Sequence, residues 1–300
     1  MPHAERPILV LGAGGQVGRA LVALLGERCV GLDRGRADLA EPNHLPAVLD
    51  AQAPRAVINA AAYTLVDRAE SEAQLAATIN GEAPGVIARW CADAGIPLVH
   101  FSTDYVFPGD GATPFTESDA VAPLNTYGAT KLFGERRIAE AGGRWLVFRT
   151  SWVYDATGRN FFTTMLRLMS ERRELSIVAD QHGAPTYAPH LAAATIGALR
   201  TAEAAPAFPS GIYHLCGSGE TTWHGFACAI RDEARARGMS LEIDSIEPIT
   251  SAEYPVPATR PANSRLDTSK AHQIFGVSLP DWREGLAECM TVYEDHRPAV

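Results

Sequence analysis

Tyr127 and Lys131 are the pair of side chains in this sequence best suited to proton transfer. They lie four positions apart in Tyr127-Gly-Ala-Thr-Lys131. The surrounding residues 125–141 have a helical pattern, so both side chains fall on one helix face. A phenol with an ordinary pKa of about 10 is a weak acid at neutral pH. Because a neighbouring ammonium group lowers that pKa, the spacing predicts a tyrosine proton donor tuned by a lysine.

The scarcity of lysine favours this interpretation over the alternative, a surface helix that carries both residues by chance. Lysine occurs only at Lys131 and Lys270, although the chain has 26 lysine and arginine residues. Arginine does not replace a compact amine whose pKa can be shifted. We therefore expect Lys131 to have a catalytic role.

A third candidate, Thr103, follows the apolar segment 98–102. In a doubly wound sheet, ligands meet the carboxyl ends of the strands. A hydroxyl group there donates to a substrate carbonyl and stabilises the developing alkoxide. Ser102 is the competing candidate, and the alternative for both is a hydroxyl that only satisfies its own turn.

The elements that must position these residues form an alternating pattern. Apolar segments predict strands at 8–11, 29–33, 56–61, 98–102 and 145–150, and helical patterns cover 17–25, 70–94 and 125–141, with a break near Pro84. Continuous apolar strands that alternate with helices indicate a parallel sheet covered on both faces. The predicted fold class is therefore α/β, a doubly wound Rossmann-type sheet.

A glycine-rich turn joins the first strand to the first helix. It reads Gly12-Ala-Gly14-Gly15-Gln16-Val17-Gly18. Glycines let the backbone approach a pyrophosphate, and the free N–H groups of the helix end face the anion. Asp33, at the end of the second strand, suits the adenosine ribose, whereas Arg34 suits a 2′-phosphate, so NADH and NADPH both remain possible.

The second half of the chain is less regular. After about Tyr154, proline, glycine and histidine accumulate between single strands and helices. We predict a dinucleotide-binding domain over 1–154 with sheet contributions from later segments, and a smaller, irregular substrate-binding lobe over 155–300.

Composition excludes several classes of protein. The formal charge of −9 argues against nucleic-acid binding, which needs a basic surface. The five scattered cysteines indicate reduced thiols rather than disulfides or a zinc site. Residues 1–6 show no signal peptide, and no apolar run is long enough to cross a bilayer. We expect a cytoplasmic protein that does not bind membranes.

Several motifs together resemble those of the extended short-chain dehydrogenases/reductases. They are Gly12 to Gly18, Asn59-Ala-Ala-Ala-Tyr63-Thr64-x-x-Asp67, Ser102-Thr103-Asp104-Tyr105-Val106-Phe107 and Tyr127-Gly-x-Thr-Lys131. A narrower resemblance, to the dTDP-4-dehydrorhamnose reductases, comes from Arg149-Thr-Ser-Trp152-Val-Tyr154, Asp180-Gln-x-Gly183-Ala-Pro-Thr186 and Arg260-Pro-x-Asn263-Ser264-x-Leu266. The matching motifs run almost from end to end of the chain.

The resemblance implies hydride transfer from NADPH or NADH to the C4 ketone of dTDP-4-dehydro-β-L-rhamnose, giving dTDP-L-rhamnose. It implies Tyr127 as proton donor, Thr103 as carbonyl stabiliser and Lys131 as the partner of Tyr127. Cofactor contacts would fall on Gly12, Gly14, Gly15, Gln16, Val17, Gly18, Asp33, Asp38, Leu39, Ala61, Ala62, Tyr63, Thr64, Tyr127 and Lys131, and substrate contacts on Thr103, Asp104, Tyr105, Trp152, Arg260 and Asn263. Arg260 and Arg265 are candidates to pair with the diphosphate.

The sequence departs from the family at one point. Some members dimerise around Mg²⁺ held by acidic side chains, whereas this chain has His190 in the first such region and Tyr293 at the matching C-terminal position. Neutral groups are poor ligands for a hard cation. We therefore expect no requirement for Mg²⁺, and a monomer or weak homodimer.

Two rival functions stay open. One is another nucleotide-sugar reductase or epimerase of the same superfamily. The other is a non-catalytic NADP-binding regulatory subunit that resembles that of methionine adenosyltransferase. Intact Thr103, Tyr127 and Lys131 argue against the second, since a binding module needs no tuned phenol.

Overall fold

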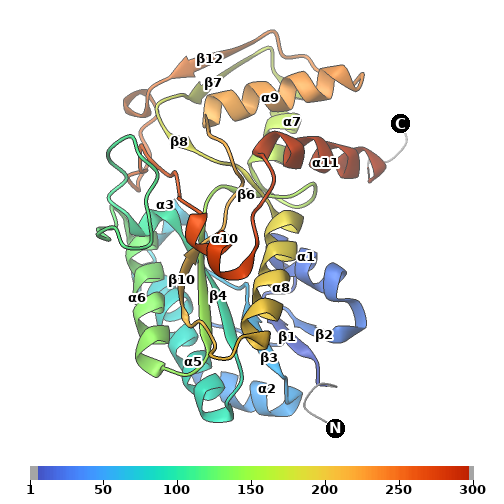
Figure 1. Cartoon of the computed structure of the whole chain (residues 1–300). Helices are drawn as coiled ribbons and strands as arrows, with labels where there is room; N and C mark the ends of the chain where they lie inside the picture. Colours follow the sequence, from blue (N-terminus) through green and yellow to red (C-terminus); the bar gives the residue numbers. More distant parts are fainter. Residues whose placement is uncertain (1–5, 297–300) are drawn as a thin grey trace.

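The computed structural model describes residues 6–296, so the amino-terminal residues 1–5 used in the signal-peptide argument lie outside the described part. Six parallel strands form the central sheet, in the order β10-β5-β4-β3-β1-β2 (Figure 1). They are β1 (Ile8–Leu11), β2 (Cys29–Leu32), β3 (Ala56–Asn59), β4 (Leu98–Thr103), β5 (Trp145–Thr150) and β10 (Gly211–His214). The order reverses beside β1, which creates the crevice where such sheets bind ligands. The predicted fold class is confirmed.

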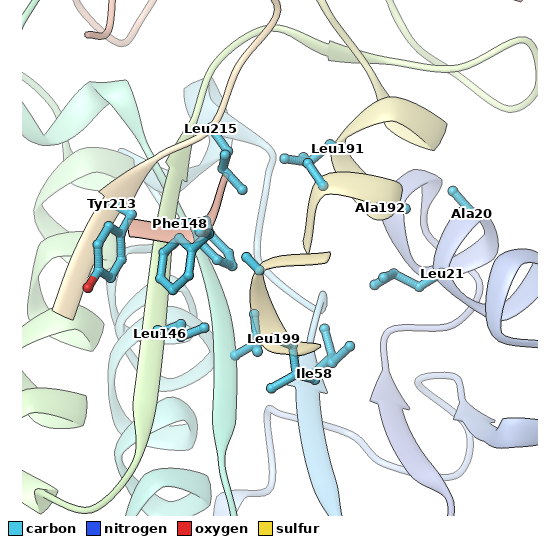
Figure 2. Packing of buried hydrophobic residues seen from close by; sticks show 14 of the residues in the cluster. Ala20, Leu21, Ile58, Leu146, Phe148, Leu191, Ala192, Leu199, Tyr213 and Leu215 are labelled. Atoms are coloured by element: carbon cyan, nitrogen blue, oxygen red, sulfur yellow. The ribbon is translucent and has the colours of Figure 1, made fainter. Parts of the chain in front are cut away.

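Alternate residues of each strand enter opposite faces of the sheet, because side chains in a strand have a period of two. Ile8 and Val10 join one buried cluster, and Leu9 and Leu11 join the other. Helices α1 (Gln16–Leu25), α8 (Ala188–Ala204) and α10 (Ser269–Phe275) contribute to the first cluster, and α2 (Leu45–Gln52), α5 (Ala83–Ala94) and α6 (Thr126–Ala141) to the second. Figure 2 shows the first cluster, where Leu191 and Leu199 of α8 lie among residues of α1 and the sheet.

A second lobe contains its own hydrophobic core. It is built from α7 (Phe161–Glu171), α9 (Trp223–Ala236) and α11 (Trp282–Asp295), together with the strands β7 (Glu174–Val178) and β12 (Ser245–Ile249), which pair in parallel. The lobe lies above the carboxyl ends of the main strands in Figure 1. The chain crosses back from this lobe to supply α8, β10 and α10 to the region of the central sheet. The predicted division into domains at 154/155 stays a prediction.

Short elements complete the chain. They are the strands β6 (Val153–Tyr154), β8 (His182–Gly183), β9 (Thr186–Tyr187) and β11 (Thr221–Thr222), the helices α3 (Val66–Ala69) and α4 (Ala73–Ala77), the π-helical turn η4 (Thr78–Glu82), and the 3-10 turns η2 (Gly26–Arg28), η3 (Pro42–His44), η5 (Asp104–Val106) and η6 (Ser251–Glu253). The break predicted near Pro84 is not a helix end: the backbone stays helical from α4 through η4 into α5. The wider π-helical turn just before Pro84 accommodates the N–H that proline lacks.

A buried ion pair fastens α6 to β5. Arg149 Nε and Nη2 donate to the two carboxylate oxygens of Glu135 at 2.9 and 2.7 Å, and Ser102 Oγ donates to Glu135 Oε1 at 2.5 Å. Both charged side chains are 3% exposed or less. The same helix carries Tyr127 and Lys131, so this pair sets where the candidate catalytic residues lie relative to the sheet.

All five cysteines are free. No helix among residues 6–296 is long and apolar enough to cross a membrane.

Candidate active site

A cleft of about 970 Å³ lies along the carboxyl ends of the central strands. It gathers most of the residues that the sequence predicts for cofactor and substrate, from segments far apart in the chain. Those lining it are Gly12, Gly14, Gly15, Gln16, Val17, Asp33, Asp38, Leu39, Ala61, Ala62, Tyr63, Thr64, Thr103, Asp104, Tyr105, Tyr127, Lys131 and Trp152. Gly18, Arg260 and Asn263 do not line it.

The glycine turn presents an open helix end to this cleft. Helix α1 has Gly15 at its N-cap, with no side-chain cap and no acidic residue in the first turn, so its first N–H groups are free for an anion. A Cβ built on Gly14 would meet nothing within 4 Å, so the backbone faces open space. These features fit the pyrophosphate of a dinucleotide.

Two glycines of the turn should respond differently to alanine. A Cβ on Gly18 would overlap the Gly12 carbonyl oxygen, so Gly18→Ala is expected to lower the free energy of unfolding by about 1–3 kcal/mol. Gly14→Ala should change it by less than about 0.5 kcal/mol, yet weaken dinucleotide binding, because the new methyl group occupies the cleft. Urea unfolding and dinucleotide titration of both variants check this. Equal stability losses would contradict the packing described here.

Asp33 and Arg34, which directly follow β2, both line the cleft. Arg34 Nε donates to Asp38 Oδ2 at 3.2 Å, and Asp38 Oδ1 accepts from the Ala40 N–H at 2.9 Å. The Ala40 bond is the main reason that the pKa of Asp38 is lowered, with Arg34 adding to it. An arginine and a carboxylate therefore stand side by side, which suits either a 2′-phosphate or a ribose hydroxyl.

Local contacts at the start of α6 hold Tyr127 at the mouth of the site. The Asn125 side chain caps the helix by accepting from the Gly128 N–H at 2.8 Å, and its amide donates to the Thr259 carbonyl at 2.8 Å. A Cβ on Gly128 would overlap the Tyr105 carbonyl oxygen, so only glycine allows this close approach. The Tyr127 and Tyr105 rings meet edge to face, with centroids 5.6 Å apart.

The pKa of Tyr127 is raised, whereas the sequence predicted that a neighbouring lysine lowers it. Burial raises it to about 12, the charge of Asp104 adds to the rise, and the Thr103 side chain partly opposes it. Lys131 is not among the groups that shift it, because the Lys131 amine points to the Phe101 carbonyl, to which it donates at 2.6 Å. Tyr127 therefore keeps its proton at neutral pH, which is the state a proton donor requires.

Lys131 is buried beside His100 and Asn59, two residues that were not predicted from the sequence. Its Nζ lies 3.1 Å from His100 Nε2, and Asn59 Nδ2 lies 3.1 Å from His100 Nδ1. The pKa of Lys131 is lowered to about 8, mainly by burial, and that of His100 well below its usual range for the same reason. The sequence does contain a feature that points to these contacts: a histidine inside an otherwise apolar strand. A buried histidine requires a hydrogen-bond partner.

The loop after β3 is held by buried asparagines. Asn59 Oδ1 accepts from the Ala61 N–H at 3.1 Å, Asn80 Oδ1 accepts from the Tyr63 N–H at 2.8 Å, and Asn80 Nδ2 donates to the Tyr63 carbonyl at 3.1 Å. Asn80 belongs to the π-helical turn η4, a feature frequent at functional sites. Its role was not predicted.

Ser102 and Thr103 have different roles in the structure. Both residues line the cleft, but the Ser102 hydroxyl donates to Glu135. Thr103 Oγ1 instead donates to Asp104 Oδ1 at 3.0 Å, accepts from the Tyr105 N–H at 3.2 Å and lies close enough to Tyr127 to affect its pKa. Of the two competing hydroxyls, Thr103 is therefore the one placed near Tyr127.

Two stacked tryptophans form the wall on the side of the second lobe. Trp152 and Trp223 have ring centroids 3.8 Å apart at 15°, and both line the cleft. Trp152 has a φ of +49°, a strained conformation of the kind that clusters at functional sites. A Cβ on Gly183 would collide with the Trp152 ring. Trp223 was not predicted, because nothing in the sequence pattern links it to Trp152.

The C-terminal polar residues predicted to contact the substrate or its diphosphate have protein partners. Arg260 donates to Asp67 at 2.8 Å, Arg265 pairs with Glu220 at 3.0 Å, and the Asn263 amide donates to the carbonyls of Asp110 and Thr113. Asn263 is 2% exposed and ties two loops together. Substrate contacts by Arg260 and Asn263 stay predictions, and Arg260 would have to leave Asp67 to make one.

An acidic side chain does lie opposite His190. Glu288 Oε2 is 2.8 Å from His190 Nε2, whereas Tyr293 packs against Phe162. The match of Tyr293 to the family's C-terminal acidic position stays a prediction. Within residues 6–296, no cluster of three or more histidine, cysteine or carboxylate side chains is arranged to hold a metal. Independence from Mg²⁺, and a monomer or weak homodimer, stay predictions.

Comparison with known proteins identifies relatives over nearly the whole chain. A family model described as the RmlD substrate binding domain matches residues 6–294. A dTDP-4-dehydrorhamnose reductase of Burkholderia thailandensis is 50% identical over 291 residues, which cover 94% of this chain and 97% of the relative. The Escherichia coli K12 enzyme of that name is 44% identical over 287 residues, 93% of this chain and 95% of the relative. A crystal structure of dTDP-4-dehydrorhamnose reductase from Bacillus anthracis in complex with NADP has a TM-score of 0.88 at 33% identity, covering 96% of this chain and 99% of that one.

Proposed function

The chain belongs to the RmlD substrate binding domain family, and we propose that it reduces the C4 ketone of dTDP-4-dehydro-β-L-rhamnose to dTDP-L-rhamnose with NADPH or NADH. Two full-length relatives at 50% and 44% identity carry the name of this activity. The relative of known structure binds NADP. The chain is thus an oxidoreductase, and its product serves dTDP-rhamnose biosynthesis.

One observation carries the proposal: three groups suited to carbonyl reduction line the same cleft as an uncapped helix end. Thr103, Tyr127 and Lys131 come from the end of β4 and the first turns of α6, and α1 points its free N–H groups at the opposite part of the cleft. A protein that only bound a dinucleotide would have no use for a protonated phenol in the cleft near the Thr103 hydroxyl.

Each group has a definite part in the reaction. The reduced nicotinamide, when bound, would supply the hydride for C4 of the sugar. Tyr127 then transfers its proton to the C4 oxygen as negative charge develops there, and Thr103 donates a hydrogen bond to the same oxygen. Lys131, whose amine is anchored at the Phe101 carbonyl, lines the cleft and would hydrogen-bond the nicotinamide ribose of the bound dinucleotide.

The tryptophan wall excludes water and orients the sugar. Trp152 and Trp223 present a stacked aromatic surface on the side of the cleft formed by the second lobe. Aromatic faces pack well against the apolar face of a pyranose ring, and closing the site strengthens the electrostatic contacts inside it.

An assay of cofactor oxidation with several 4-keto sugar nucleotides tests the proposal. We expect steady NADPH or NADH consumption with dTDP-4-dehydro-L-rhamnose and a lower kcat/KM with 4-keto sugars of other configuration or base. An epimerase would instead interconvert sugars without net cofactor consumption. A regulatory subunit would bind the dinucleotide and oxidise none of it. Either result would refute the proposal.

Replacing Lys131 with methionine should impair both turnover and dinucleotide binding. Methionine fills the space of the lysine stem but removes the amine, so the fold is expected to survive while kcat/KM falls by about 10²-fold. Fluorescence titration should also show weaker binding of the dinucleotide, because Lys131 lines its part of the cleft. Unchanged dinucleotide affinity together with unchanged kcat would contradict the role assigned to Lys131.

A further inference from the structure

The Thr103 hydroxyl has a single hydrogen, and Asp104 takes it. Thr103 Oγ1 donates to Asp104 Oδ1 at 3.0 Å and accepts from the Tyr105 N–H at 3.2 Å. A hydroxyl group offers one donor and two acceptor positions. While Asp104 is ionised and can only accept, Thr103 therefore has no hydrogen left for a substrate carbonyl.

Asp104 lies where a carboxylate is poorly stabilised. Its side chain is 3% exposed, and Oδ2 has no hydrogen-bond partner within the described residues. No lysine, arginine or histidine among residues 6–296 forms an ion pair with it. The titratable and polar side chains that face it are neutral: Ser264 of the C-terminal segment, Tyr105 of η5, Tyr127 of α6 and the Cys216 thiol after β10.

Burial is the main reason that the pKa of Asp104 is raised to about 7, and the hydroxyls of Ser264 and Thr103 oppose the rise. Both protonation states are therefore accessible near neutral pH.

We propose that Asp104 is a positioning residue whose protonation switches Thr103 into its role as carbonyl donor. The protonated carboxyl group donates to Thr103 Oγ1, which then accepts two hydrogen bonds and has its own hydrogen free for the C4 oxygen of the substrate. The proton on Asp104 is not consumed, because the proton added to the product comes from Tyr127. This inference rests on the proposed reductase function.

Asp104→Asn tests the switch, because an amide offers a permanent N–H to Thr103. The quantity to follow is kcat/KM of Asp104→Asn divided by kcat/KM of the wild type at each pH. Titration of Lys131 changes kcat/KM of both enzymes by the same factor, so its effect cancels in this ratio. We expect this ratio to rise about tenfold per pH unit above pH 7, where the wild type loses its protonated Asp104. A ratio that is constant with pH, or that falls, would overturn the proposal.

Thr103→Val provides the matched control. Without the Thr103 hydroxyl there is nothing to switch, so Asp104→Asn made in the Thr103→Val background should change kcat/KM by the same factor at every pH. A pH-dependent ratio that persists in this background would show that Asp104 acts on the substrate directly, and would overturn the proposal.

A second measurement does not depend on turnover. The infrared band of the protonated Asp104 carboxyl group, obtained as the difference between wild type and Asp104→Asn, should disappear on titration with a midpoint near pH 7 without substrate. A midpoint in the ordinary aspartate range would overturn the switch even if the enzyme is active. Conversely, a protein that shows the raised midpoint but reduces no sugar nucleotide would refute the proposed function alone.

Discussion

Tyr127→Phe is expected to reduce kcat by about 10²–10⁴-fold while leaving the dissociation constant of the dinucleotide nearly unchanged. The substitution removes the phenolic hydroxyl and nothing else, and burial holds the pKa of that hydroxyl at about 12, so the wild-type donor is fully protonated at working pH. Without it, the developing alkoxide must take a proton from water or from a group placed less well. Steady-state kinetics together with dinucleotide titration measure the two effects separately.

Tyr213→Phe is the matched control. Tyr213 lies on β10, is 4% exposed and belongs to the buried cluster on the opposite face of the sheet from Tyr127, and its hydroxyl donates to the Pro209 carbonyl at 2.8 Å. Loss of that bond should cost about 1 kcal/mol of stability and leave kcat unchanged. If Tyr127→Phe retained wild-type kcat, Tyr127 would not be the proton donor, whatever the control showed.

Glu135→Gln is expected to lower the free energy of unfolding by about 3–5 kcal/mol. The substitution leaves the Arg149 guanidinium buried without its counter-charge, and one of its nitrogens, Nη1, already has no hydrogen-bond partner among the described residues. The amide oxygen of the glutamine can still accept one hydrogen bond from Arg149 but carries no charge, and the contact over the Phe107 ring at 4.9 Å is too weak to compensate. Denaturant unfolding at neutral pH measures the loss.

Two further variants isolate the cause. Glu171→Gln breaks an exposed pair with Arg167 on α7 and should cost only a few tenths of a kcal/mol, roughly the value of surface pairs. Replacing both buried partners, Glu135→Leu with Arg149→Met, should recover most of the lost stability, because two apolar side chains need no counter-charge. A loss below about 1 kcal/mol in Glu135→Gln would show that the pair does not fasten α6 to β5.

Five of the six central strands were predictable because each is a short apolar run whose alternate residues enter two buried clusters, whereas β10 lies in the irregular second half of the chain and was not predicted. The predicted 8–11 and 145–150 match β1 and β5, and the predicted 29–33 and 56–61 extend only one or two residues beyond β2 and β3. The helix over 125–141 was predicted one residue early, because Asn125 caps the helix rather than joining it. Local pattern and capping chemistry decide these features.

The parts of the site that depend on packing were not predictable. Trp223 reaches Trp152 only because the second lobe folds over the sheet, and Asn80 reaches Tyr63 through the π-helical turn. The same limitation explains why the sequence predicted a lowered pKa for Tyr127 although burial raises it. Spacing places an amine one helical turn away, but it does not reveal that the amine points at a main-chain carbonyl while the phenol is buried.

Transfer of a labelled hydride tests the central claim most directly. NADPH carrying deuterium at C4 of the nicotinamide, on the face that is transferred, is incubated with dTDP-4-dehydro-L-rhamnose, and the product is analysed by NMR and mass spectrometry. We predict dTDP-L-rhamnose with one deuterium at C4 of the sugar, formed in equal amount to the oxidised cofactor. Product without deuterium at C4, or dinucleotide that binds but is not oxidised, would contradict the assignment of this chain as the reductase.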